Sequence, residues 1–249
     1  PPPPHKHPPP PPTTTRHGVR RQRQMCIRDR YWGLKQDVHS KAMQIHAQSA
    51  PERIKRVTVY ASSSNALADE YYLSAARLGT VLGKAGLQIS YGGGGVGLMR
   101  EMADHAMAEG AQVHGVIPHF LNTVEHGHDK LSTLEVVEDM RERKHRMLVD
   151  SNAVVSLPGG SGTFEELFEV LTLKRLGLFL GPVILVNTRG YFDRFADFLS
   201  HSVAERFMSD RHLDMWSLVN EPEQVLQAMH EAAEWTEDAR RFAAVQAES

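Results

Sequence analysis

Residues 158–166 of this sequence, PGGSGTFEE, combine three glycines with two adjacent carboxylates. They follow a β-branched run at residues 153–157 that predicts a buried strand, and they precede apolar residues at helical spacing over residues 164–178. A strand, a glycine turn and a helix start point backbone N–H groups and the positive end of a helix dipole at one spot. Such a spot attracts an anion, usually phosphate, and bare glycine backbone lets the ligand lie close. The stretch therefore predicts an anion-binding turn.

The carboxylates of Glu165 and Glu166 are unusual directly after an anion-binding turn. A protein that only binds phosphate would gain from Lys or Arg there, so an acid indicates chemistry beside the phosphate. The same residues also fit a capping box, in which Thr163 caps the helix and Glu166 reaches back to its start. The local pattern does not choose between the two interpretations.

A second chemical signal is the charged segment at residues 140–147, MRERKHRM. On a helix, Met140, Arg143 and Met147 fall on one face, and methionines normally face the core. Arg143 would then be buried, which is costly unless an acid or a ligand anion pairs with it. Glu166 and a substrate phosphate are both candidates. The alternative is a solvated charge run, with Arg143 lying along the surface.

A second glycine turn, at residues 92–97, matches the dinucleotide fingerprint GxGxxG by letter. The acid that would hold a ribose hydroxyl is missing, because the strand ending at Ile117 is followed by Pro118 and His119. This disfavours an NAD- or NADP-dependent dehydrogenase. Two interpretations remain: a second cradle for a mononucleotide phosphate or ribose, and a tight turn that packs a helix on the sheet.

These turns need a scaffold, and the periodicity predicts one. Strands are expected at residues 57–61, 87–91, 112–117, 134–137, 153–157, 183–186 and 216–219, and helices at 67–84, 98–109, 139–149, 164–178, 191–207 and 223–235. Strands that alternate with helices and are continuously apolar indicate a parallel sheet covered on both faces. We expect a single α/β domain, a Rossmann-like doubly wound sheet, which binds ligands at the carboxyl ends of its strands.

Composition limits the function classes further. The formal net charge is -2, but residues 1–56 hold 12 Lys+Arg against 3 Asp+Glu, which leaves 16 against 27 for the remainder. The acidic remainder argues against nucleic-acid binding. With Cys26 as its single cysteine, the chain has no disulfide framework, which fits a reducing compartment.

Domain organisation and location follow from the same survey. Residues 1–50 are rich in Pro and Arg and predict a disordered or non-native leader rather than an RNA-binding arm, so the domain should occupy residues 51–249. There is no 18-residue apolar run or signal-peptide core, so a cytoplasmic protein with no membrane partner is expected. The pair His126-x-His128 alone does not make a metal site.

The two chemical signals together resemble a known family. Residues 158–166 fit the PGGxGTxxE signature of the Lonely Guy family, the cytokinin riboside 5′-monophosphate phosphoribohydrolases, and residues 140–144 fit its MxxRK segment. Further blocks at 61–64, 91–94, 97–99 and 115–118 are similar, so the resemblance covers residues 56–207. The turn after the first strand departs from the family, reading Ala-Ser-Ser at 61–63 where Cys-Gly-Ser is common. Many relatives carry the label lysine decarboxylase, but the residues give no evident pyridoxal site.

The resemblance implies hydrolysis of the N-glycosidic bond of AMP or N6-prenylated AMP, giving free base and ribose 5-phosphate. It makes Glu166 the catalytic carboxylate, beside the positive charge that develops on the ribose, and Arg143 its partner. The substrate-binding residues that it implies are Gly159, Gly160, Ser161, Gly162, Thr163, Lys144, Glu125, Thr172, Ser62, Gly94, Gly97 and Met99. It implies no cofactor and a homodimer. The alternative is a nucleotide- or cofactor-binding carrier or sensor on the same fold, in which Arg143 and Glu166 form a structural ion pair.

Overall fold

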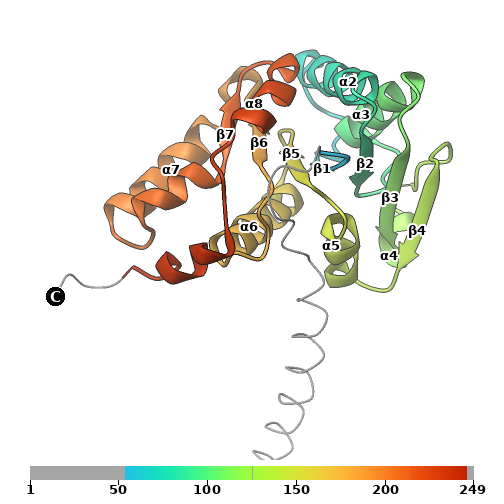
Figure 1. Cartoon of the computed structure of the whole chain (residues 1–249). Helices are drawn as coiled ribbons and strands as arrows, with labels where there is room; N and C mark the ends of the chain where they lie inside the picture. The colour runs from blue at the N-terminus through green and yellow to red at the C-terminus, as the bar shows by residue number, and fades with distance from the viewer. Residues whose placement is uncertain (1–53, 125, 246–249) are drawn as a thin grey trace, which may run out of the picture. The chain divides into compact units, whose positions relative to one another are not determined.

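The computed structural model describes residues 54–124 and 126–245, and the expected leader at residues 1–50 lies outside them. These residues build one seven-stranded sheet in the order β4-β3-β2-β1-β5-β6-β7, with every neighbouring pair parallel (Figure 1). The strands are β1 (Arg56–Tyr60), β2 (Gln88–Tyr91), β3 (Val113–Pro118), β4 (Thr133–Val137), β5 (Ala153–Ser156), β6 (Val183–Val186) and β7 (Ser217–Val219). The order reverses between β1 and β5, so their carboxyl ends form the switch point at which such sheets bind ligands. The doubly wound fold is confirmed.

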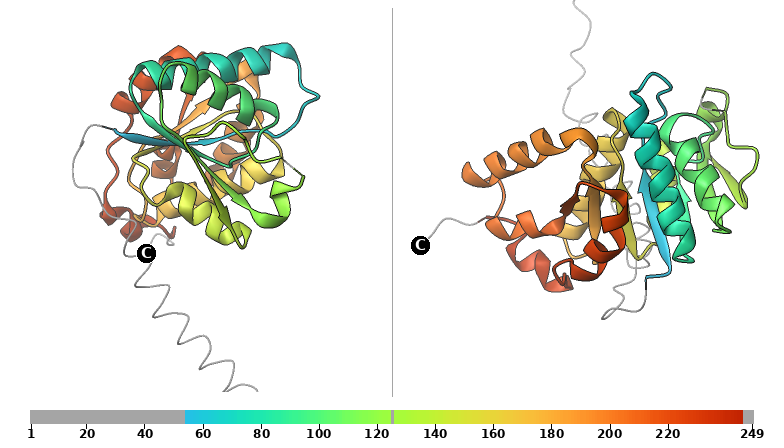
Figure 2. Two further views of the ribbon diagram at one scale, coloured as in Figure 1. Left: turned by 90° about the vertical axis from the view of Figure 1, so that its right-hand side faces the viewer. Right: turned by 90° about the horizontal axis from the view of Figure 1, so that it is seen from above.

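Helices cover both faces of the sheet. They are α2 (Asp69–Lys84), α3 (Gly97–Ala108), α4 (His119–Asn122), α5 (Met140–Leu148), α6 (Ser161–Arg175), α7 (Asp193–Ala204) and α8 (Val225–Glu231), with the 3-10 turns η1 (Thr188–Gly190), η2 (Asp210–Met215), η3 (Pro222–Gln224) and η4 (Glu237–Phe242). One core packs α2, α3 and α8 against the sheet, and the other packs α5, α6 and α7. Figure 2 shows the α2 and α3 layer and the α5 layer on opposite sides of the strands.

The apolar strands form as expected because both of their faces are covered. Every residue of β5 and of β6 is buried. Successive side chains alternate between the two cores: Val155 joins the core under α2 and α3, whereas Val154 joins the core under α5 and α6. None of the helices among the described residues combines the length and apolar character needed to cross a bilayer.

Three helix predictions were wrong at their ends. The helix expected at 164–178 runs from Ser161 to Arg175 because Gly177, with φ +66°, turns the chain out of the helix. The helix expected at 191–207 is shorter, at Asp193–Ala204. The helix expected at 223–235 ends at Glu231, and Trp235 leaves it to donate its indole N–H to the Lys174 carbonyl.

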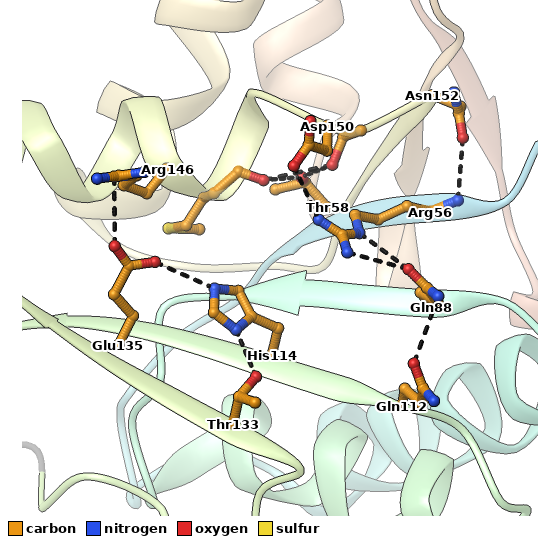
Figure 3. Close-up of polar contacts among 12 residues, drawn as sticks. Arg56, Thr58, Gln88, Gln112, His114, Thr133, Glu135, Arg146, Asp150 and Asn152 are labelled. Carbon is orange, nitrogen blue, oxygen red and sulfur yellow. Dashed lines mark hydrogen bonds and ion pairs between the residues drawn. The ribbon is translucent and has the colours of Figure 1, made fainter.

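Polar contacts join neighbouring strands near their amino-terminal ends (Figure 3). The Arg56 guanidinium at the start of β1 donates to Gln88 Oε1 (3.0 Å) and to Asp150 Oδ2 (3.3 Å). On β3, His114 lies between Thr133 Oγ1 and Glu135 Oε2, and Glu135 also pairs with Arg146 of α5. These side chains bond to one another and tie the sheet to α5 and to the residues that follow it.

Candidate active site

The first turn of α6 follows β5 through the glycine stretch. Gly160 is the N-cap residue, and the first helical hydrogen bond runs from Phe164 N to Gly160 O (3.1 Å). The backbone N–H groups of residues 161–163 therefore precede the helical ladder and have no partner within the helix. Residues 160–162 are exposed. Together with the dipole of a 15-residue helix, these free backbone donors give the start of α6 the geometry that attracts an anion.

The capping box considered for Thr163 and Glu166 does not form. Because α6 begins at Ser161, Thr163 lies inside the first turn, and the N-cap residue Gly160 makes no side-chain capping bond. Thr163 is instead buried against Gly159, where an added Cβ would lie 2.0 Å from Thr163 Oγ1. The alternative that explained Glu166 as a helix cap is thus removed.

The other two glycines of the stretch have no such packing reason. A Cβ added at Gly160 or at Gly162 would meet no protein atom within 4 Å, and neither residue has a positive φ. The protein's own packing therefore does not require glycine at these two positions. A ligand lying against the backbone would account for them.

Glu166 lies in the second turn of α6 and is 7% exposed. Its carboxylate lies near Tyr60, the last residue of β1. Burial, with a further contribution from the charges of Glu166 and Glu169, holds the pKa of the Tyr60 phenol well above its ordinary value. Tyr60 pairs in register with Ser156 of β5, so this carboxylate lies at the switch point.

Arg143 is buried as predicted, at 6% exposure, on the inner face of α5. Its Nε donates to the Val116 carbonyl of β3 (3.1 Å), and its Nη2 donates to the Gly92 carbonyl after β2 (2.7 Å). These acceptors compensate part of the cost of burying a guanidinium. The surface interpretation of Arg143 was wrong. Sequence reasoning named an acid or an anion as its partner and missed the two carbonyls, for which residue types give no signal.

The helices that carry Arg143 and Glu166 contact each other at the adjoining positions. Lys144 Nζ lies 2.8 Å from Glu165 Oε1 and 3.1 Å from Glu169 Oε2. Burial alone would lower the pKa of Lys144, but its bonds to the two carboxylates outweigh that effect and the pKa is raised. The ammonium is thus fixed between α5 and α6, and its expected contact with phosphate stays a prediction.

The predicted residues around the second glycine turn mainly contact one another. Gly97 has φ +60°, donates to Asn65 Oδ1 (2.9 Å), and would clash with Ser62 O if it carried a Cβ. Met99 N also approaches Ser62 O (3.3 Å), and Tyr91 donates to the Gly94 carbonyl (3.3 Å). This geometry favours the packing interpretation for Gly97. The substrate contacts expected of Ser62, Gly94, Gly97 and Met99 stay predictions.

Thr172 and Glu125 are the remaining predicted substrate contacts, and the structure describes only Thr172. Thr172 is exposed on α6 and donates to the Phe168 carbonyl (2.7 Å). At roughly 100° per residue it lies about 120° around the helix from Glu166. Glu125 lies outside the described residues.

Sequence reasoning missed Tyr191. Its hydroxyl donates to the Gly159 carbonyl (2.6 Å), and its ring stacks on Phe164 at 6.3 Å between centroids. Tyr191 lies in the segment after β6, and its bond holds the backbone of the glycine stretch in place. No sequence signal marks this residue, because Tyr191 and Gly159 are 32 residues apart in the chain and only the fold brings them together.

Within residues 54–124 and 126–245, no three His, Cys, Asp or Glu side chains gather as a metal site would require.

A parallel doubly wound sheet with an open glycine turn and a buried carboxylate at its switch point defines a Rossmann-like α/β protein, and such sheets bind their ligands at this edge. Comparison with known proteins is more specific. A family model described as possible lysine decarboxylase matches residues 99–229. The chain belongs to that family, whose relatives include the cytokinin riboside 5′-monophosphate phosphoribohydrolases of the Lonely Guy type.

Two relatives illustrate the similarity. The cytokinin riboside 5′-monophosphate phosphoribohydrolase LOG of Oryza sativa subsp. japonica is 38% identical over 159 residues, which span 64% of this chain and 65% of the rice protein. The cytokinin riboside 5′-monophosphate phosphoribohydrolase of Rhodococcoides fascians is 37% identical over 169 residues, 68% of this chain and 85% of that protein.

Solved structures share the fold at lower identity. The molybdenum cofactor carrier protein of Chlamydomonas reinhardtii has a TM-score of 0.56 at 20% identity, covering 72% of this chain and 98% of its own. The molybdenum cofactor binding protein of Rippkaea orientalis has a TM-score of 0.55 at 18% identity, covering 73% and 98%. These likenesses concern the fold alone.

Proposed function

We propose that this chain hydrolyses the N-glycosidic bond of a nucleoside 5′-monophosphate, AMP or N6-prenylated AMP, to give the free base and ribose 5-phosphate. The observation that carries the proposal is the meeting of two features at one sheet edge. An open helix start with bare glycine backbone at residues 160 and 162 adjoins the buried carboxylate of Glu166. The names of the relatives support the same reaction.

The chemistry follows from the charges. Cleavage of the bond between ribose and base develops positive oxocarbenium charge on the sugar, which a nearby carboxylate stabilises. The same carboxylate of Glu166 can orient or deprotonate the attacking water. The phosphate held at the start of α6 supplies binding energy away from the breaking bond and fixes the position of the sugar.

Arg143 serves this reaction from the neighbouring helix. The carbonyls of Val116 and Gly92 fix two of its N–H donor groups, so the guanidinium keeps one orientation. In this proposal its positive charge orients the Glu166 carboxylate or assists the departing base. The exposed apolar side chains of Phe168 on α6 and Leu176 directly after it support a homodimer. Sedimentation of the purified wild type and of Phe168→Glu tests this assembly, and a monomeric wild type refutes it. A cytoplasmic location stays a prediction.

The test is release of free base. The full chain is incubated with AMP and, separately, with isopentenyl-AMP, and base and ribose 5-phosphate are quantified over hours. We expect both products in equal amounts. Binding of AMP without any base released would instead favour the carrier or sensor. Comparing kcat/KM for the two nucleotides then identifies the preferred base, because each additional methylene held in an apolar pocket changes the preference by about 1–3 kcal/mol.

A further inference from the structure

One buried histidine lies outside the residues assigned to the reaction. His128 belongs to the connection between β3 and β4, and its side chain is 1% exposed. Its Nε2 lies 3.0 Å from Asp104 Oδ1 of α3, and its Nδ1 accepts a hydrogen bond from Lys130 N (3.2 Å). Since Nδ1 accepts, the proton resides on Nε2, which donates to Asp104. Both ring nitrogens are therefore engaged, and the ring has one orientation.

The backbone around His128 pairs with the second glycine turn. His128 N donates to Gly93 O (3.0 Å), and Gly95 N donates to His126 O (2.8 Å), on either side of an antiparallel bridge between Gly94 and Gly127. A Cβ on Gly95 would lie 2.5 Å from His126 O. Residues 126–128, which we call the strap, thus lie directly on the turn.

The second glycine turn also contacts Arg143. The carbonyl of Gly92, adjacent to Gly93, accepts from Arg143 Nη2 at 2.7 Å. A Cβ on Gly92 would lie 2.1 Å from the same nitrogen, so this is close contact. A displacement of the turn would move the acceptor and, with it, the guanidinium. A misplacement of catalytic groups by about 1 Å, caused by a mutation far from the reacting atoms, can lower an enzyme's rate by about a hundredfold.

We propose that His128 is a positioning residue for the reaction: it anchors the strap to α3, and the strap fixes the second glycine turn and the Gly92 carbonyl that orients Arg143. This inference rests on the proposed function. Other charged groups near the ring are Arg100, which pairs with Asp104 at 3.3 Å, and Asp129, 3.9 Å from Nδ1. Asp104 keeps Arg100 as a partner if the ring is replaced, so the substitution does not strand an unpaired acid.

The test compares His128→Phe, which keeps a flat ring of somewhat larger size and removes both nitrogens, with His128→Gln, which keeps an N–H donor. The matched control is His105→Phe, because His105 also contacts an acid, Glu101, but lies on the exposed side of α3. We expect His128→Phe to lower kcat for AMP hydrolysis about 10- to 100-fold with KM changed less than about threefold. His128→Gln should retain activity within about threefold of the wild type, and so should the control.

Two further readouts separate positioning from general stability. Amide hydrogen exchange should accelerate at residues 93–97 and 126–128 in His128→Phe while the strands of the central sheet keep their protection. Asp104→Ala should lower kcat in the same way, because it breaks the contact between His128 and Asp104. The double variant should lose no more activity than His128→Phe alone, because that substitution already breaks the same contact. The proposal would be overturned if the activity losses of His128→Phe and Asp104→Ala multiplied in the double variant. An unchanged kcat in His128→Phe, or an equal loss of kcat in the His105→Phe control, would also overturn it.

The two proposals fail differently. If the wild type releases no base from AMP or isopentenyl-AMP, the hydrolase proposal fails, and the positioning role for the reaction fails with it. Exchange at residues 93–97 still reports whether the strap holds the turn. If the wild type is active and His128→Phe keeps its kcat, only the positioning role fails.

Discussion

Gly162→Ala should raise the stability of the protein and lower its activity. Gly162 is the second residue of α6, its φ is not positive, and an added Cβ would meet no protein atom within 4 Å. The substitution therefore introduces no clash in the folded chain. The new methyl group would, however, lie on the exposed backbone where we propose that the phosphate binds.

The expected size of each effect follows from general values. Replacing glycine by alanine at a compatible helical position stabilises a protein by about 0.4–1 kcal/mol, chiefly through the unfolded state. For a domain of this size that raises Tm by about 1–4 °C. The loss of one charge-assisted phosphate hydrogen bond costs about 1.5–3 kcal/mol, which is roughly a 10- to 150-fold loss in kcat/KM.

The assay is thermal unfolding and AMP hydrolysis on the same preparations, with Gly83→Ala as the control. Gly83 lies inside α2, where an added Cβ would come 2.8 Å from Ala106 O, so this variant should unfold at a lower temperature and keep its activity while folded. Gly162→Ala should do the reverse. Full activity in a stabilised Gly162→Ala protein would refute the idea that the ligand lies on this backbone. A lower Tm would show that the protein itself requires glycine there.

Two other substitutions test the buried charges. Gly92→Ala places a methyl group 2.1 Å from Arg143 Nη2, so we expect the guanidinium to move and kcat to fall about tenfold or more. Steady-state kinetics of the folded variant measures this loss, and an unchanged kcat would contradict it. Lys174 is buried on α6 with its ammonium donating to Gly181 O (2.6 Å), and burial lowers its pKa to about 7. Because the folded pKa lies below the unfolded value of about 10.4, the unfolded state holds the extra proton between these values, and stability should rise with pH from 7 to 10 by at most about 1.4 kcal/mol per unit. Lys174→Met should remove this part of the slope in denaturant titrations, and a slope equal to that of the wild type would refute the assignment.

Much of the fold follows from local pattern. Apolar runs such as residues 183–186 allow only a strand covered on both faces, and the glycine turn after β5 fixes where α6 starts to within a few residues. The burial of Arg143 also followed from periodicity, because the methionine at 147 marks the inner face of its helix.

The contacts that orient the site were harder to predict. Arg143 donates to the carbonyls of Val116 and Gly92. Tyr191, which follows β6, donates to the carbonyl of Gly159, which follows β5. Every residue has a carbonyl, so residue type does not mark the one that accepts a bond. The sequence predicted that this helix ends at Leu178, because that apolar residue continues the helical periodicity. The helix ends at Arg175 instead, because Gly177 has a positive φ.

The most direct measurement compares kcat of the wild type with that of Glu166→Gln at saturating AMP, with the dissociation constant for AMP measured on the same proteins. Glu165→Gln is the matched control, because Glu165 is the adjacent acid but is exposed and paired with Lys144. We predict that Glu166→Gln lowers kcat about 10²- to 10⁴-fold and changes AMP affinity by less than about tenfold, while Glu165→Gln stays within about threefold of the wild type. A Glu166→Gln protein that releases adenine at the wild-type rate would contradict the account.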